Sequence, residues 1–248
     1  MPLKAVTLAE RRDLEDEFER FAVAGWPRFL RQRDELGVRR YWPSLFTTFA
    51  DFQLYVMEGH RVVAVGQTVP FPWDGTPGGL PDSIADVLRL ALETRSNGHQ
   101  PTALCALAAI ADPERRGRGL SAEVLRAMAA VARQHGLATL VAPVRPTLKA
   151  TYPLAPMERF VRWTRPDGAP LDPWIRTHWR LGAEIVKVAP RTLVIVGRVA
   201  DWEAWTDMPF PDSGPYVVSG ALQPVVIDRQ QDRGRYEDPN VWMLHRVA

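Results

Sequence analysis

The segment with the clearest chemical potential is a short loop that alternates arginine and glycine before an amphipathic stretch. It contains Arg116-Gly117-Arg118-Gly119-Leu120-Ser121. At a helix start, outward-pointing backbone N–H groups and the helix dipole favour an anion. Gly117 and Gly119 let the backbone approach a diphosphate closely, and Arg116 and Arg118 add positive charge. The loop predicts a phosphate site. A solvated basic turn stays open, whereas a Rossmann loop is disfavoured because no acidic residue follows the next strand in the expected place.

The composition excludes several other chemistries. Cys105 is the one cysteine, so an internal disulfide and a thiolate zinc site are both excluded. The five histidines are scattered without an i, i+4 pair, and a metal enzyme is not expected. A formal net charge of +2 provides no bulk field for nucleic acid or an anionic membrane. A Gly-x-Ser-x-Gly nucleophile motif is also absent from the sequence.

The elements that must position the loop follow from hydrophobic periodicity. Apolar positions predict helices through Leu14–Ala22, Phe29–Leu36, Ile84–Leu92, Leu120–Val131 and Pro173–Leu181. Strands are expected at Lys4–Thr7, in a hairpin of Phe52–Met57 and Arg61–Val69, and at Thr102–Ala111, Thr139–Val144, Glu184–Val188 and Thr192–Arg198. Tyr41-Trp42-Pro43 is expected to begin a loop. Thr102–Ala111 is apolar on both faces, which favours a buried central strand containing Cys105.

Length and hydropathy indicate how the chain is organised. With 248 residues and 46% hydrophobic residues, one domain can bury a substantial core. We expect a single domain with a core of about residues 3–198, and residues 199–248 as an extension packed on it. The longest uncharged stretch, Ser96–Ala111, is too short to span a membrane. Charged residues at the N-terminus do not fit a signal peptide, so we expect a cytoplasmic protein.

Residues 116–121, after a strand and Asp112-Pro113, resemble the acyl-CoA loop of the GNAT acetyltransferase superfamily, written Arg/Gln-x-x-Gly-x-Gly/Ala. Arg116 and Gly119 match, and Ser121 departs at the third defined position, where a small residue is tolerated. The resemblance implies an α/β (α+β) fold with a central splayed mixed sheet flanked by helices. It also implies that two splayed strands hold a pantetheine arm between them. Pro143 in the expected strand Thr139–Val144 is consistent with such splaying. Ile110 and residues 116–121 form the implied CoA-binding set.

The last expected helix departs from ordinary GNAT enzymes in an informative way. Those enzymes usually carry a tyrosine four residues before a Gly-Phe, and His178 stands at that place here, before Gly182. Several segments resemble a narrower branch, the GNAT-like decarboxylases of polyketide synthase loading modules. These segments are Arg145–Lys149, Tyr152–Leu154, Glu158–Phe160, Asp167–Gly168, Asp172–His178, Asp201–Thr206 and Asp238–Trp242.

That narrower resemblance implies a catalytic pair, Thr147 and His178, with Trp42 and Arg191 lining the acyl pocket. Loss of carbon dioxide from a malonyl thioester leaves an enolate, which donors from Thr147 and His178 would stabilise. His178 could also pass on the proton that quenches the α-carbon. Trp42 would supply an apolar wall and Arg191 would hold the carboxylate. Coenzyme A or an acyl carrier protein would carry the substrate, and no metal or further cofactor is implied.

Each assignment has a plainer alternative. His178 and Trp42 could be packing residues, Thr147 could cap a turn, and Arg191 could pair with a surface carboxylate. Our leading hypothesis is decarboxylation of a malonyl-type thioester to an acetyl-type starter unit for polyketide or other secondary metabolism. The second is acyl transfer from acetyl-CoA to an amine or thiol. The third is a catalytically inactive module that binds CoA.

Overall fold

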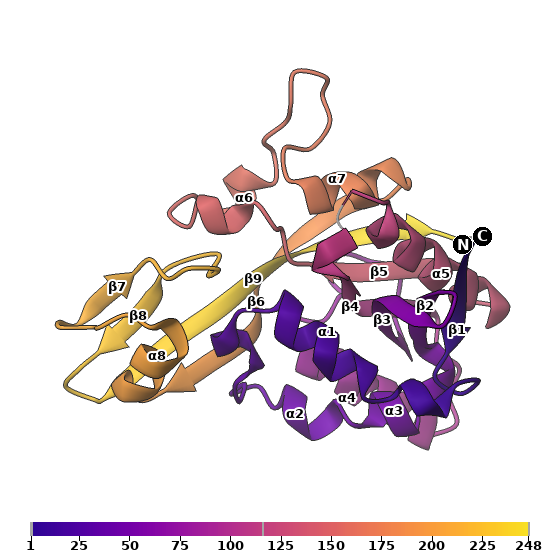
Figure 1. Ribbon diagram of the computed structural model, residues 1–248, viewed down its shortest axis with the longest axis horizontal. Helices are drawn as coiled ribbons and strands as arrows, with labels where there is room; N and C mark the ends of the chain where they lie inside the picture. Colours follow the sequence, from indigo (N-terminus) through magenta and orange to yellow (C-terminus); the bar gives the residue numbers. More distant parts are fainter. Residues whose placement is uncertain (1, 116, 248) are drawn as a thin grey trace.

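A computed structural model describes residues 2–115 and 117–247 (Figure 1). Its centre is a nine-stranded mixed sheet with the order β1-β2-β3-β4-β5-β9-β8-β7, and β6 also pairs with β9. The strands are β1 Leu3–Thr7, β2 Gln53–Glu58, β3 Arg61–Phe71, β4 Ala103–Ala111, β5 Thr139–Val144, β6 Glu184–Gly197, β7 Gly214–Tyr216, β8 Val225–Asp228 and β9 Arg233–Arg246. The helices are α1 Glu17–Gly25, α2 Val38–Tyr41, α3 Ser44–Thr47, α4 Ile84–Ser96, α5 Leu120–Gln134, α6 Met157–Phe160, α7 Pro173–Arg180 and α8 Val199–Thr206.

Helices cover both faces of the sheet, so its central strands are buried on two sides. Helices α1 to α4 lie on one side, and α6 and α7 lie on the other (Figure 1). Helix α5 packs on the α7 side, where Val124 and Met128 join a core cluster with Ile175 of α7. The Ser83 hydroxyl oxygen begins α4 by accepting a hydrogen bond from the Asp86 N–H at 3.1 Å. This arrangement confirms the mixed α/β class and the sheet flanked by helices.

Strand β4 is the buried central strand that the apolar run predicts. It pairs antiparallel with β3 along almost its whole length, and Cys105 is completely buried within it. Burial raises the pKa of the Cys105 thiol far above its usual range, because a thiolate there would be desolvated. Cys105 is therefore a core residue, and its thiol stays protonated and unreactive.

The neighbouring parallel strands β4 and β5 separate after a short contact. Their backbones pair only at Leu104–Leu140 and Cys105–Val141, although β4 continues to Ala111 and β5 to Val144. β5 is paired with β9 on its other edge throughout. The result is a wedge-shaped gap that opens toward the carboxyl ends of both strands. We call this gap the β4–β5 wedge.

The C-terminal part of the chain supplies a central strand, which differs from the extension that we expected. β9 lies between β5 and β6, and its pairing with β6 runs from Glu184–Leu244 to Gly197–Gly234. β6 is one long strand with an irregularity between Ala189 and Leu193, where the sequence suggested two strands. Both long strands continue away from the helices and carry α8, β7 and β8 at their far end (Figure 1).

Two local expectations near the N-terminus are wrong. A single 3-10 turn, Arg28–Arg31, replaces the helix expected through Leu36. Beyond it, a carboxylate oxygen of Asp34 accepts a hydrogen bond from the Val194 N–H at 2.6 Å, which fastens this segment to β6. Trp42 has helical dihedral angles between α2 and α3 and does not begin a loop. Tertiary contacts override the local preferences at both places.

Candidate active site

The glycine–arginine loop begins α5 at the open end of the β4–β5 wedge. Gly119 is the N-cap of α5 at φ +74°, and Gly117 has φ +82°. A Cβ at either glycine would meet no atom within 4 Å, so these positions require glycine for backbone conformation and not for space. Among the described residues no side chain caps this helix start, which leaves its first N–H groups available to an anion.

The other residues expected to bind CoA differ in exposure. Arg118 is exposed, Ser121 is half-buried and Leu120 is buried beneath the loop. Arg116 lies outside the described residues. Ile110 is buried on the α1 side of the sheet, where its side chain would contact a Cβ added at Gly25.

Asp112 fixes the start of this loop, although the sequence analysis gave it no role. Its carboxylate is almost fully buried, and it accepts hydrogen bonds from the Arg61 guanidinium at 2.9 Å and the Glu114 N–H at 3.0 Å. Arg115 pairs with Glu58 on β2. The Asp-Pro pair after a buried strand was the available signal for this anchoring role.

Thr147 lies just beyond the end of β5, at the mouth of the wedge, and its side chain is exposed. The adjoining N–H of Leu148 donates to Asp172 at 2.6 Å. Asp172 also caps α7 by accepting from the N–H groups of Trp174 and Ile175 at 2.8 and 2.9 Å. One buried carboxylate therefore joins the Thr147 loop to the start of the helix that carries His178. Burial raises the pKa of Asp172, and its backbone N–H donors partly offset that rise.

A partly buried ion pair holds the same loop from its other end. Arg145 follows β5 and donates to Asp238 of β9 at 3.0 Å and to the Gly220 carbonyl at 2.7 Å. Tyr236 donates its hydroxyl to the same carboxylate at 2.5 Å. These contacts hold the segment after β5 in place and therefore help to position Thr147.

His178 is packed in the interior against the last strand. It is 1% exposed, and its Nδ1 lies 2.9 Å from Nε2 of His245 on β9. The edge of the Trp174 ring contacts the imidazole, with ring centroids 4.4 Å apart. Nε2 of His178 is buried and has no hydrogen-bond partner among the described residues. Burial, with a smaller effect from His245, lowers the pKa of His178 to about 3, and burial lowers that of His245 to about 4.

The structure places Thr147 and His178 at different levels of the wedge. His245 is the β9 partner of Leu140, which lies at the closed end where β4 and β5 still pair. His178 therefore lies over the closed end, whereas Thr147 lies at the mouth. Among the described residues, no hydrogen bond joins the two. Six residues separate Asp172 from His178, about 9 Å along the axis of α7.

Trp42 and Arg191 are also placed apart from His178. Trp42 is half-buried on the α1 side of the sheet, against Phe18 and Trp26 at ring-centroid distances of 5.7 and 6.5 Å. His178 packs on the opposite side. A ligand could contact both Trp42 and His178 only by passing through a gap in the sheet, such as the β4–β5 wedge. Arg191 is exposed at the irregular part of β6.

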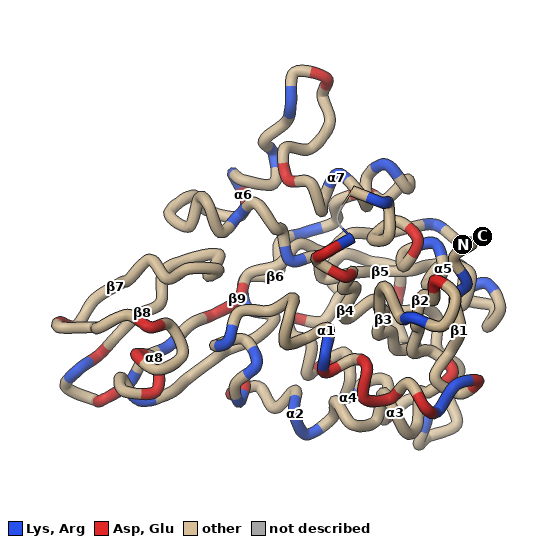
Figure 2. The backbone as a smooth tube through the Cα atoms, in the orientation of Figure 1, with Lys and Arg blue, Asp and Glu red and all other residues tan. Residues whose placement is uncertain are grey.

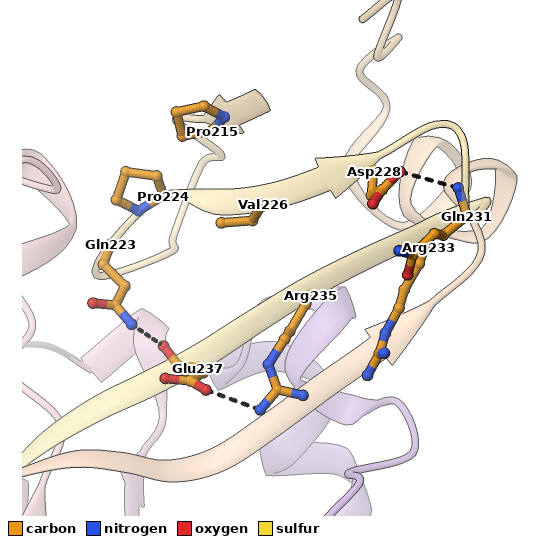
Figure 3. A pocket seen from close by; sticks show the side chains of 9 residues that line it. All are labelled: Pro215, Gln223, Pro224, Val226, Asp228, Gln231, Arg233, Arg235 and Glu237. Atoms are coloured by element: carbon orange, nitrogen blue, oxygen red, sulfur yellow. Dashed lines mark hydrogen bonds and ion pairs between the residues drawn. The ribbon is translucent and has the colours of Figure 1, made fainter. Parts of the chain in front are cut away.

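A surface concavity lies elsewhere on the molecule. It has a volume of about 590 Å³ and sits over β8 and β9, where Val226 lies among Arg233, Arg235 and Glu237 (Figure 3). Basic and acidic positions both occur along β8 and β9 (Figure 2), and Arg235 pairs with Glu35 and Glu237. About 26 Å of strand separates Glu237 from His245. Its lining suggests no reaction, and it is remote from the wedge.

Two features of the described residues bear on other classes of function. No helix in residues 2–115 and 117–247 has the length and apolar character to cross a bilayer. Over the same residues, no cluster of three or more His, Cys, Asp or Glu side chains is arranged to hold a metal ion.

Similarity to known proteins identifies the superfamily of this chain. No family model matches the sequence. An arginine N-acetyltransferase of Aspergillus versicolor, avaD, is 32% identical over 90% of this chain and 85% of its own length. The chain belongs to the GNAT superfamily. It is therefore an enzyme of that superfamily, and the resemblance inferred from the loop at residues 116–121 is confirmed.

Solved structures extend the GNAT fold over the whole chain, including β7 to β9. The loading GNAT-like domain of CurA from Lyngbya majuscula matches with a TM-score of 0.61, covering 99% of this chain and 97% of its own at 17% identity. The GphF GNAT-like decarboxylase, solved with isobutyryl-CoA, matches at the same TM-score and identity over the full length of both chains. At this identity the two matches establish the fold. CoA thioesters are the ligands of such GNAT relatives, and no metal cofactor is indicated.

Proposed function

We propose that this GNAT enzyme transfers an acyl group from acyl-CoA to an amine nitrogen, with arginine-like amines as the first acceptors to test. The observation that carries thioester binding is the β4–β5 wedge, which opens beside the uncapped start of α5. The diphosphate would bind the α5 N–H groups, and the pantetheine arm would reach into the wedge toward its closed end. The preference for an amine acceptor rests on the similarity to the arginine N-acetyltransferase.

In this reaction the amine nitrogen bonds to the thioester carbon and the C–S bond breaks, so that its electron pair stays on sulfur. The nitrogen loses a proton, and the thiolate finally takes one up. His178 packs against His245 at the level of the closed end, where a thioester at the tip of the arm would arrive. Burial keeps the His178 imidazole neutral at pH 7, and its Nε2, which has no partner among the described residues, is the ring atom left to exchange a proton with a bound substrate.

Decarboxylation of a malonyl-type thioester is the second candidate. Support for it comes from a histidine in place of the usual tyrosine on α7, together with a threonine hydroxyl at the mouth of the wedge. In that reaction Thr147 and His178 would donate to the enolate oxygen, with Trp42 and Arg191 around the carboxylate. An acyl carrier protein would then be an alternative to CoA as carrier. The present separation of Thr147 from His178 requires the substrate to span the two.

A direct assay separates the two candidates. Purified protein is mixed with acetyl-CoA and arginine, and separately with malonyl-CoA or a malonyl carrier protein, and the products are followed by mass. We expect an acetylated acceptor and free CoA that depends on the added amine. Carbon dioxide release from the malonyl thioester without any amine, and no acetylated product with any basic amine tested, would reject our proposal in favour of decarboxylation.

Two variants sharpen the comparison. Thr147→Val removes an exposed hydroxyl, so we expect amine acetylation to change less than about threefold. Loss of one oxyanion donor typically costs about 10²-fold or more, which is the drop expected in decarboxylation. His178→Phe keeps an aromatic ring in the interior and should abolish either reaction, while binding of CoA measured by calorimetry persists.

A further inference from the structure

A second imidazole on β9 completes the surroundings of His178. His245 is 5% exposed and faces the same core as α7 and α5. It lies in the part of the chain that we expected to be peripheral, 67 residues from His178. The separation of 2.9 Å between Nδ1 of His178 and Nε2 of His245 is a hydrogen bond, and one of the two nitrogens must carry the proton.

The two possible directions of this bond have opposite consequences for Nε2 of His178. Burial keeps both rings neutral near pH 7, so each ring has one N–H and one lone pair. When His178 donates from Nδ1, its Nε2 presents a lone pair and can accept a proton. When His245 donates from Nε2, Nε2 of His178 carries a hydrogen and can act only as a donor.

The end of α7 favours one of these directions. Leu181 is the C-cap of α7, where carbonyl groups lack partners inside the helix. The Leu181 backbone raises the pKa of His245, which is the direction that a carbonyl acceptor produces. A carbonyl can accept only from the N–H of His245. A His245 that donates to this carbonyl from Nδ1 has a lone pair left on Nε2, the atom that lies 2.9 Å from Nδ1 of His178.

We propose that His245 is a positioning residue that accepts a hydrogen bond from Nδ1–H of His178 and thereby keeps the Nε2 of His178 as a proton acceptor. The proposal rests on acyl transfer as the function of the site. As the amine nitrogen bonds to the acyl carbon and the C–S electron pair goes to sulfur, the proton lost from nitrogen passes to Nε2. The thiolate receives a proton from that imidazolium, directly or through water, and the neutral ring is restored.

Nε2 of His178 is buried and has no hydrogen-bond partner in the part of the chain that the structure describes. An unsatisfied buried polar atom costs about 1–3 kcal/mol, so a purely structural histidine would be expected to find a partner for both nitrogens. In His178, Nδ1 is hydrogen-bonded and Nε2 has no partner among the described residues, as in binding sites where a ligand supplies the missing hydrogen bond. His245 acts on the reaction only through His178.

Nitrogen-15 NMR of the histidine side chains in the full chain tests the proposal without an activity assay. We expect the His178 signals, assigned by comparison with His178→Phe, to show a protonated Nδ1 and an unprotonated Nε2. In His245→Phe the fixed acceptor is lost, and the Nε2-protonated form should appear. A wild-type His178 that is protonated on Nε2 overturns the proposal, whatever reaction the enzyme catalyses.

Kinetics with matched variants give the second readout. His245→Phe should lower kcat for amine acetylation by at least tenfold with KM for acetyl-CoA within about twofold. His245→Gln puts an amide near the position of Nε2 and should restore most of kcat, and His99→Phe, an exposed position, should change nothing. Equal kcat in the Phe and Gln variants, with both chains folded, overturns the positioning role. If His245→Phe does not fold, the wild-type spectrum and the Gln variant still decide.

Discussion

At the scale of single residues, Asp172 joins the loop that carries Thr147 to the helix that carries His178. Its carboxylate accepts hydrogen bonds from the N–H of Leu148 and from two N–H groups at the start of α7. We predict that Asp172→Ala lowers the free energy of unfolding by about 1–3 kcal/mol, since a helix cap and a buried backbone partner are lost together. Urea unfolding followed by circular dichroism measures this change.

Two controls accompany the Asp172 measurement. Asp172→Asn retains one carbonyl oxygen and should lose less stability than the alanine variant. Asp82→Ala removes an exposed carboxylate that precedes α4 and should stay within about 0.5 kcal/mol of the unchanged chain. Equal stability of Asp172→Ala and Asp82→Ala would show that the cap contributes nothing.

The two buried imidazoles make stability sensitive to acid. The pKa values of about 3 for His178 and about 4 for His245 lie below the ordinary value of 6.5. At a pH between these folded-state values and 6.5, the unfolded chain therefore binds more protons than the folded chain. Stability is therefore complete above about pH 6.5 and falls as the pH drops, by about 1.4 kcal/mol per pH unit for each ring that stays neutral. Urea unfolding at pH 7, 6 and 5 measures the slope.

A variant comparison assigns that slope to the pair. His245→Gln, which keeps a polar partner and removes one titrating ring, should flatten the dependence between pH 5 and 6.5. His60→Gln, at the exposed turn between β2 and β3, should leave the slope as it is. A flat profile in the unchanged chain would contradict the neutral, buried state of these rings.

Sequence reasoning found some residues of the site and missed others for a definite reason. Gly117 and Gly119 were predictable because a helix start with positive φ is a local property. His178 was found through a family pattern and not through its surroundings. His245 could not be found, because it acts through a contact with α7 that spans tens of residues of chain. Asp238 was noted only as part of a family motif, and its contact with Arg145 also joins distant parts of the chain. Asp172 carried a local signal, an Asp-Pro pair at a helix start, that was read only as part of a family motif.

At the scale of single elements, the α5 start gives a sharp test of the CoA loop. Gly119 at φ +74° has no neighbour that a Cβ would strike, so Gly119→Ala adds only backbone strain, about 1–2 kcal/mol. We predict that KM for acetyl-CoA rises about tenfold, the factor that about 1.4 kcal/mol represents, with kcat little changed. Steady-state kinetics at saturating amine measures both.

Gly78→Ala is the matched control for Gly119→Ala. Gly78 has an ordinary φ, and an added Cβ would approach only Thr76 Oγ1 at 3.8 Å. Its kinetics should equal those of the unchanged chain. An unchanged KM in Gly119→Ala would mean that the loop does not bind the thioester in its present conformation.

Elements with a strong local signal were predicted well. The β2–β3 hairpin, the capped helix α4, the buried strand β4 and the amphipathic helix α5 all occur where the pattern indicated. The pairing partners were harder, because β-sheet register depends on distant strands. Strand β9 was missed altogether, and its mixture of Asp, Pro and Asn with apolar residues hides a strand whose partners are β5 and β6.

At the scale of the whole molecule, the sheet ties the last fifty residues to the site. His245 and Asp238 both belong to β9, which spans Arg233–Arg246. A wedge between β4 and β5 requires β5 to be held on its other edge, and β9 supplies that edge from Val144–Val241 to Thr139–Arg246. The C-terminal part is therefore required for the shape of the site as well as for the fold.

This leads to a prediction about where the chain can be shortened. A chain ending at Arg198 loses β9, and with it the partner of both β5 and β6, so we expect no cooperative urea transition and no CoA binding. A chain beginning at Leu8 loses only β1, which pairs with β2 alone at the sheet edge, and it should keep a cooperative transition at lower urea. Circular dichroism and calorimetry with CoA measure both outcomes. A folded chain that binds CoA without residues 199–248 would show that β5 and the wedge hold their shape without β9, contrary to the pairing seen here.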